Sequence, residues 1–207
     1  MTRPIDVLIL ESRSGGAQAA AAELEAAGHT VHRCHDPGEP AFPCRGVVDP
    51  AGCPLEGPID VALVVRDHID RDPTALESGV ACALRAGVPV VEDGPADLDP
   101  FAPWITFRVG NASVAHTCEQ AVVLSYEPLL DDMRRRCSPL FDAAGIDQSQ
   151  VSFRAELDWP KLQVHLEVPE PVSGGVREAL AVRALDAVRA GRRTYHTVNV
   201  QVREVAD

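Results

Sequence analysis

Aromatic residues and lysines are scarce in this chain of 207 residues. Phe, Trp and Tyr together make up 4% of it, and Lys161 is its one lysine. We therefore expect a core of small aliphatic side chains, mainly Ala, Val and Leu, in close contact with one another. The chain also has no apolar run approaching the ~20 residues that cross a bilayer, so the sequence predicts no membrane span.

The first residues also lack the pattern of an export signal. Met1–Pro4 leads at once into the short apolar run Val7–Leu10, whereas a secretory signal has a longer apolar segment. We therefore expect a cytoplasmic protein. In that compartment the six cysteines are expected to be thiols or metal ligands and not disulfides.

Basic residues are in the minority. The chain has 19 Lys and Arg against 31 Asp and Glu, which gives a net charge of −12 at pH 7. A surface of that sign repels phosphate backbones, which argues against nucleic acid as a partner. The one run of three basic residues, 134–136, directly follows Asp131 and Asp132, so it predicts a salt-bridged helix face.

The first half of the sequence alternates between apolar runs and helix-forming segments. Strands of a buried parallel sheet are predicted at 7–10, 29–35, 60–65 and 88–91, with an edge strand at 104–109. Helices are predicted at 17–27 and 74–86. Gly28 and Gly87 follow them, in the position where glycine commonly ends a helix. Residues 1–109 are therefore predicted to form an α/β domain whose parallel sheet is flanked by helices.

The second half has a different order of elements. Helices are predicted at 111–124, 129–144 and 175–190. Strands are predicted at 151–157, 162–168 and 197–205, the first two as a hairpin. Residues 111–207 are therefore predicted to form a smaller α+β module in the order α-α-β-β-α-β.

Four segments of the first half carry a family resemblance. VLILES at 7–12, AAGHTV at 26–31, DVALVV at 60–65 and AGVPVV at 86–91 resemble the matching parts of response-regulator receiver domains. Receiver domains have a flavodoxin-like fold and accept a phosphoryl group on an aspartate. The resemblance therefore implies a receiver-like parallel sheet over about half of the chain.

The residues that a receiver uses for phosphotransfer are incomplete in this chain. The family clusters acidic residues after the first strand, where this sequence has Glu11 alone. The phosphoacceptor aspartate belongs at the end of the third strand, which Val65 and Arg66 occupy, and Asp67 comes just after them. The lysine of the last receiver strand is missing. The resemblance therefore implies a receiver-like domain that has lost phosphotransfer.

The end of the chain resembles two other families. Its strand-strand-helix-strand order, ending in TVNVQVREV at 197–205, is similar to the alkaline-shock family of envelope-stress proteins. It is also similar to the cytoplasmic domain of cation-diffusion-facilitator transporters, which dimerises and can bind metal. Both resemblances imply an assembly module, so we expect a homo-oligomer or a protein partner.

A loop at 36–58 separates the second and third predicted strands. It holds six Pro and four Gly, and a loop of this length inside a compact domain is either functional or disordered. The candidate metal ligands around it are Cys34, His35, Cys44 and Cys53. Thiolate and imidazole are ligands that zinc prefers, and a bound ion contributes folding energy directly. The sequence therefore suggests a structural zinc site.

Other roles stay open for these cysteines. They are separated by gaps of nine and eight residues, which match no standard zinc ribbon, so Cys34, Cys44 and Cys53 can equally be small packing groups. An iron–sulfur cluster requires a similar thiolate set. A third possibility is a disulfide between Cys44 and Cys53, with Arg45 beside Cys44 as the activating cation.

Two further segments lie where open α/β sheets bind ligands, beyond the carboxyl ends of the strands. The turn at 11–18 leads into a helix N-terminus, whose N–H groups can hold an anion, but it lacks the G-x-G-x-x-G pattern. His68 stands beside Asp67 and near Asp70, an arrangement that fits either acid–base chemistry or a polar loop.

These observations favour a non-catalytic regulatory or adaptor protein, with no catalytic residue assigned, whose Cys/His loop holds a structural metal. One alternative is a thiol-dependent redox protein or enzyme that uses His68 and the loop cysteines. A second alternative, from the C-terminal resemblance, is an envelope-stress scaffold.

Overall fold

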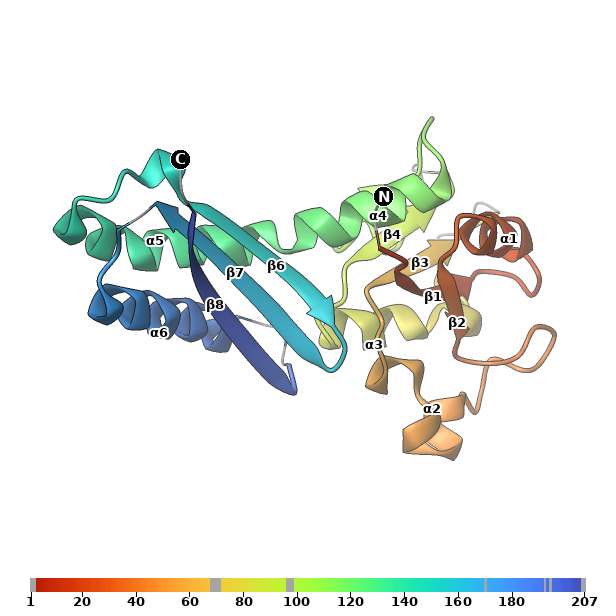
Figure 1. Cartoon of the computed structure of the whole chain (residues 1–207). Helices are drawn as coiled ribbons and strands as arrows, with labels where there is room; N and C mark the ends of the chain where they lie inside the picture. Colours follow the sequence, from red (N-terminus) through yellow and green to blue (C-terminus); the bar gives the residue numbers. More distant parts are fainter. Residues whose placement is uncertain are drawn as a thin grey trace. The chain divides into compact units, whose positions relative to one another are not determined.

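The computed structural model describes residues 3–67, 72–95, 99–169, 171–191, 193 and 195–205. The chain divides into two compact units, Met1–Ser125 and Tyr126–Asp207 (Figure 1). Each unit has its own sheet, of five strands in the first and three in the second. The predicted fold class, a parallel α/β sheet followed by a smaller α+β module, is confirmed.

The sheet of the first unit is entirely parallel. Its strands are β1 (Asp6–Glu11), β2 (Thr30–Arg33), β3 (Val61–Val65), β4 (Val90–Asp93) and β5 (Phe107–Arg108). Their order in the sheet is β2-β1-β3-β4-β5, and every neighbouring pair runs parallel. This is the strand order of flavodoxin-like folds. The fold implied by the receiver resemblance is therefore present, although a shared strand order does not establish a shared family or function.

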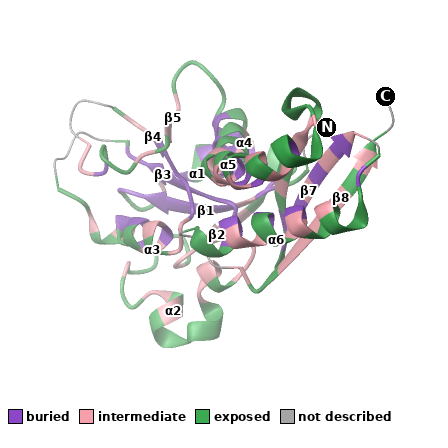
Figure 2. Cartoon of the chain, turned by 90° about the vertical axis from the view of Figure 1, so that its left-hand side faces the viewer, coloured by how far each residue is buried: buried purple, intermediate pink, exposed green. Residues whose placement is uncertain are grey.

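Helices lie on both faces of this sheet. On one face α4 (Val114–Ser125) packs on β3, β4 and β5 and contacts α1 (Gln18–Ala26). On the other face α3 (Gly79–Arg85) packs on β3 and β4. Figure 2 shows the strands between these helices as mostly buried and the outer helix faces as exposed.

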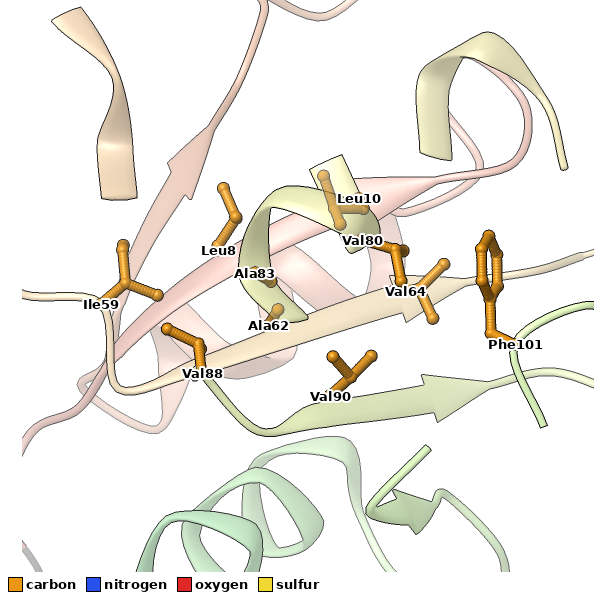
Figure 3. Packing of buried hydrophobic residues seen from close by; sticks show 10 residues of the cluster. All are labelled: Leu8, Leu10, Ile59, Ala62, Val64, Val80, Ala83, Val88, Val90 and Phe101. Atoms are coloured by element: carbon orange, nitrogen blue, oxygen red, sulfur yellow. The ribbon is translucent and has the colours of Figure 1, made fainter. Parts of the chain in front are cut away.

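Small aliphatic side chains make up the core between the sheet and α3. Figure 3 shows side chains of the strands facing those of the helix: Leu8, Leu10, Ala62, Val64 and Val90 opposite Val80 and Ala83. The alternate residues of the strands, such as Val7 and Leu63, are fully buried as well. Because both faces are covered, each of these strands is an uninterrupted apolar run in the sequence.

Helix α4 belongs to the first unit. The boundary drawn from the sequence, at residues 109 to 111, places this helix in the second module. Its buried residues include Val114, Cys118 and Ala121, and the backbone N–H of Ala115 donates to Glu23 of α1 at 3.1 Å. The structural division therefore falls after Ser125.

The second unit combines a mixed sheet with two helices. Its strands β6 (Ser152–Asp158) and β7 (Lys161–Pro169) form an antiparallel hairpin, and β8 (Thr197–Val205) pairs in parallel with β7. The crossover that a parallel pair requires is α6 (Gly174–Ala190), which packs against α5 (Glu127–Ala144).

The core of the second unit lies on one face of its sheet. Buried residues alternate along β7, at Leu162, Val164, Leu166 and Val168. Phe153 of β6 meets Phe141 of α5 edge to face, with ring centroids 6.2 Å apart. The residues of β7 between the buried ones are polar except Pro169, so the sequence of this strand alternates as a strand buried on one face should.

In the part of the chain that the structure describes, no helix combines the length and the apolar character that crossing a membrane requires. The longest, α5, has 18 residues and carries an acidic and basic stretch at 131–136.

Replacing Leu8 with Ala tests the core of the first unit. Leu8 is fully buried, so removing its isobutyl group should lower the free energy of unfolding by about 2–5 kcal/mol. Urea unfolding measures this in a Trp159→Phe background, where Trp104 alone reports on the first unit. The matched control is Leu124→Ala, because Leu124 is 45% exposed and its loss should cost clearly less. Equal losses for the two variants would contradict the assigned core.

Candidate functional site

The carboxyl ends of β1 and β3 bring together the polar residues that follow each strand. The backbone N–H of Ser12 donates to the carbonyl of Val65 at 2.9 Å, which holds the two chain segments side by side. The Asp67 carboxylate accepts a hydrogen bond from the Ser12 hydroxyl at 3.3 Å and forms a salt bridge with Arg13. Asp67, the residue nearest to a receiver phosphoacceptor, is thus engaged by the turn after β1.

Glu11, the last residue of β1, fills the turn that leads into α1. Its side chain is buried, and its two carboxylate oxygens accept from the backbone N–H groups of Gly15 and Ala17, each at 3.1 Å. These are the N–H groups beside the α1 N-terminus that an anion would use. The anion site considered for residues 11–18 is therefore occupied by a carboxylate of the protein itself.

A second charged cluster follows β3. Arg66 is only 2% exposed, and its guanidinium lies 3.0 Å from Glu77 and 3.7 Å from Asp99. It also lies over the ring of Phe101, 5.7 Å from the centroid. Glu77 additionally accepts from the backbone N–H of Thr74 at 2.6 Å, as part of a capping box. A buried charge is costly unless it is paired, so these contacts indicate a structural role for Arg66.

Two acids of this cluster share a hydrogen bond. Burial is the largest of the causes that raise the pKa of Glu92 to about 7; the hydrogen bond with Asp99 and the Asp99 charge also raise it, while Arg108 and Arg66 oppose the rise. Burial also works against ionisation of Asp99, but hydrogen bonds from Glu92, Phe101 and Arg108 outweigh it and lower the pKa of Asp99. Arg108 lies 2.5 Å from Glu92 and forms a salt bridge with Asp99. At pH 7 Glu92 is therefore about half protonated and Asp99 is ionised, and Arg108 and Arg66 lie beside them.

Of the residues considered for acid–base chemistry, His68 and Asp70 lie outside the described residues. Asp67 is described, and its contacts include those to Ser12 and Arg13 given above. The sequence did not single out Glu92 or Asp99, because each stands near Pro, Gly and other acids in what reads as a polar link. Nothing in the sequence alone shows that they meet.

The segment between β2 and β3 contains the other group of candidate residues. It forms the short helix α2 (Arg45–Val48) and two 3-10 turns, η1 (Pro50–Gly52) and η2 (Pro54–Glu56). None of these three elements has a buried residue. Figure 1 shows α2 lying away from the sheet, beyond the ends of the neighbouring strands. The segment is thus ordered into turns without an apolar core of its own.

Cys34 lies where this segment meets α3. A Cβ atom added to Gly79, the first residue of α3, would come within 3.3 Å of the Cys34 sulfur. Burial is the largest of the causes that raise the pKa of the Cys34 thiol to about 12; the thiols of Cys44, Cys53 and Cys82 also raise it, whereas Arg45 lowers it. Of these thiols, Cys82 was not recognised from the sequence, because it lies in a helix far along the chain.

The histidines near this region point to other partners. His35 lies with its Nδ1 3.4 Å from the carbonyl oxygen of Asp36, and His32 lies with its Nε2 2.7 Å from Asp6. Within the described ranges, no three Cys, His, Asp or Glu side chains are already placed to hold a metal ion. The zinc site expected from Cys34, His35, Cys44 and Cys53 thus stays a prediction.

The outer side of the same segment exposes apolar side chains. Phe42 and Val48 are each 72% exposed, and Val47 is 59% exposed. A cavity of about 550 Å³ opens here, and its lining includes Phe42, Val48 and His35 with the acids Asp36 and Asp49. Exposed large apolar groups gathered around a hollow are typical of a surface that binds a partner.

Comparison of the chain with protein-family models, with curated proteins and with solved structures finds no match. The function therefore has to be argued from the chain's own residues.

The shared proton of Glu92 and Asp99 should make stability depend on pH. The folded-state pKa of Glu92, about 7, lies above its usual value, so the native state holds this proton more tightly than the unfolded chain does. The corresponding stability is present at low pH and is lost as the pH rises through about 7. At roughly 1.4 kcal/mol per pKa unit, the decrease in the free energy of unfolding amounts to about 1–3 kcal/mol. Glu92→Gln should abolish this decrease.

Free energies of unfolding at pH 5 and pH 8, for the wild type and the variant, measure the effect. Glu25→Gln makes the same substitution on an exposed face of α1, so its pH profile should follow the wild type. A Glu92→Gln profile that also follows the wild type would argue against the shared proton.

Proposed function

We propose that this chain is a non-catalytic regulatory or adaptor protein built on a receiver-like domain. The proposal rests on one observation: the carboxylates of Glu11 and Asp67, at the carboxyl edge of the first sheet, are already bound by groups of the protein itself. Glu11 takes the N–H groups of Gly15 and Ala17, and Asp67 is held by Ser12 and Arg13. Phosphotransfer to a receiver requires an open, metal-binding acidic pocket at this edge, and these contacts disfavour one.

The partner of such an adaptor would bind the outer side of residues 35–49. The exposed Phe42 and Val48 offer apolar area, and the adjoining cavity can accept a side chain of the partner. Asp36, Glu39 and Asp49 line the same cavity with one arginine, Arg45, which pairs with Asp36, so the acids remain in excess and a partner segment that combines an apolar side chain with basic neighbours fits the charge.

The alternative of thiol-dependent catalysis has less support. The nucleophile in such chemistry is the thiolate, which requires a lowered pKa. Burial and the neighbouring thiols raise the pKa of Cys34 to about 12, so this thiol remains protonated near pH 7. Cys34 is therefore a poor nucleophile.

Acetyl phosphate tests the loss of phosphotransfer. When the full chain is incubated with acetyl phosphate and Mg²⁺, we expect no gain of a phosphoryl group in its intact mass, whereas an active receiver run in parallel gains one. A phosphoryl group that appears on the wild type and is absent from Asp67→Asn would overturn the proposal.

We further propose that the second unit assembles two copies of the chain. Strand β8 is nine residues long and lies at the edge of its sheet, and no described strand pairs with its outer side. An edge of this length is a template for pairing with another strand. Antiparallel pairing of β8 with a second β8 about a two-fold axis would join the two sheets into one.

The mass of the full chain in sedimentation equilibrium tests this assembly, and we expect the mass of two chains. In such a pair Gln201, the central residue of β8, faces its own copy, so Gln201→Lys places like charges opposite each other and should weaken the dimer. Gln163→Lys, on the same sheet face but in the central strand β7, is the matched control and should leave the dimer intact. A monomeric wild type would contradict the proposed assembly.

A further inference from the structure

We propose that the cavity lined by residues 35–52 binds an arginine side chain of a partner protein, next to an aliphatic residue of that partner. This partner chemistry rests on the adaptor function proposed above and specifies what the adaptor recognises. The lining of the cavity belongs entirely to the first unit and runs from just after β2 to η1.

Backbone hydrogen bonds give this segment a defined shape before any partner binds. The N–H of Arg45 donates to the carbonyl of Cys34 at 2.9 Å, which closes the chain between them into a loop at the end of β2. Inside this loop the N–H of Glu39 donates to the carbonyl of Asp36 at 3.0 Å. Two of the lining residues are prolines, whose φ is restricted. A partner therefore meets a surface that costs little entropy to order.

Phe42 and Val48 supply the apolar part of the site. Each is 72% exposed, and both line the cavity of about 550 Å³. That volume lies within the range of roughly 300–1,000 Å³ that is usual for ligand sites. Among the residues that the structure describes, no aromatic ring or guanidinium packs against Phe42. The ring is therefore available to a side chain of the partner.

The charged part of the site consists of three carboxylates and one guanidinium. Arg45 forms a salt bridge with Asp36. Asp49 accepts from the backbone N–H of Ala51 at 3.1 Å, as the N-cap of η1. In the described part of the chain, no cationic side chain pairs with Asp49 or with Glu39. The cavity therefore has an excess of negative charge that a cation from outside would neutralise.

A guanidinium fits this combination better than an ammonium does. Its plane stacks on an aromatic face, and its fork of N–H groups can donate to two acceptors at once. Phe42 is the exposed ring, and Glu39 and Asp49 are the acceptors that have no cation. An aliphatic residue beside the arginine would cover Val48, so the partner segment combines an aliphatic side chain with an arginine.

The charge of the whole chain favours the same kind of partner. Its net charge of −12 at pH 7 attracts a basic segment and accelerates the encounter. A second copy of the chain carries the same net charge and is repelled at long range. A basic segment of another protein is therefore the favoured occupant of this cavity.

Three capped peptides test the recognition of arginine. The probe is Gly-Leu-Arg-Leu-Gly, titrated into the isotope-labelled full chain and followed by NMR. The matched peptides replace the arginine with lysine or with citrulline, which keeps the shape of arginine without its charge. We expect the shifts of the wild type to be confined to residues 35–52. The lysine peptide should bind about 2–5-fold more weakly, through loss of stacking, and the citrulline peptide about 10-fold more weakly.

Variants of the chain locate the site. Phe42→Ala should weaken binding of the arginine peptide by at least about 5-fold, as loss of an aromatic anchor does. Glu39→Gln should weaken it about 2–5-fold, whereas Arg45→Gln should strengthen it by a similar factor, because Arg45 competes for Asp36. Val123→Ala is the matched control, since Val123 is 59% exposed on α4 of the same unit and should bind as the wild type does.

Urea unfolding guards against a folding defect, and Phe42→Ala should unfold at the wild-type urea concentration because Phe42 is exposed. Absence of binding by the wild type would overturn the proposal. So would equal affinity for the arginine and citrulline peptides, or binding that survives Phe42→Ala. A change from the mass of two chains to that of one on Phe42→Ala would also overturn it, because the occupant would then be a second copy.

The acetyl phosphate test distinguishes this partner site from the adaptor function itself. A chain that gains no phosphoryl group and binds no peptide would keep the adaptor function and lose this partner. A phosphoryl group on Asp67 together with arginine-selective binding would do the reverse.

Discussion

Burial of the first sheet on both faces is the constraint on which the rest of this unit depends. With α3 on one side and α1 and α4 on the other, the strands themselves present almost no polar side chain, so polar chemistry is restricted to their ends. At the carboxyl ends the polar residues pair with one another: Glu11 with backbone N–H groups, Arg66 with Glu77, Arg108 with Glu92 and Asp99. Beyond β2, Cys34 lies beside the start of α3. Two different regions thus arise from one packing arrangement.

The two regions are stabilised by different physical means. The acids of the charged cluster and Arg66 are buried, whereas Arg108 is half-buried, and each acid is neutralised by an arginine or by a shared proton, as the opposite pKa shifts of Glu92 and Asp99 indicate. The cysteine segment has neither a buried charge network nor a buried apolar side chain. Its surface instead exposes Phe42 and Val48, which would be an unfavourable arrangement for a segment with no partner to bind.

The sequence predicted elements well and contacts less well, for identifiable reasons. The strands β1, β3 and β4 are continuous apolar runs because both of their faces are covered, and Gly28 and Gly87 follow α1 and α3 closely, so these elements were evident. The unit to which α4 belongs was not evident from the sequence, because an amphipathic helix does not reveal which sheet it packs on. The packing of Cys34 against Gly79 at the start of α3 was missed because it arises from tertiary packing, which residue spacing does not record. The pairing of Glu92 with Asp99 depends in the same way on the neighbouring strand β5, through Arg108.

The contact of Glu11 with the turn before α1 has an evolutionary consequence. The backbone there already has the shape that presents N–H groups at a helix N-terminus, and one side chain of the protein fills it. A single replacement of Glu11 by a short neutral residue would leave the backbone in place and free those donors for a phosphate or carboxylate from outside. Descendants of this chain could therefore acquire an anion-responsive domain by losing one interaction, without inventing a new fold.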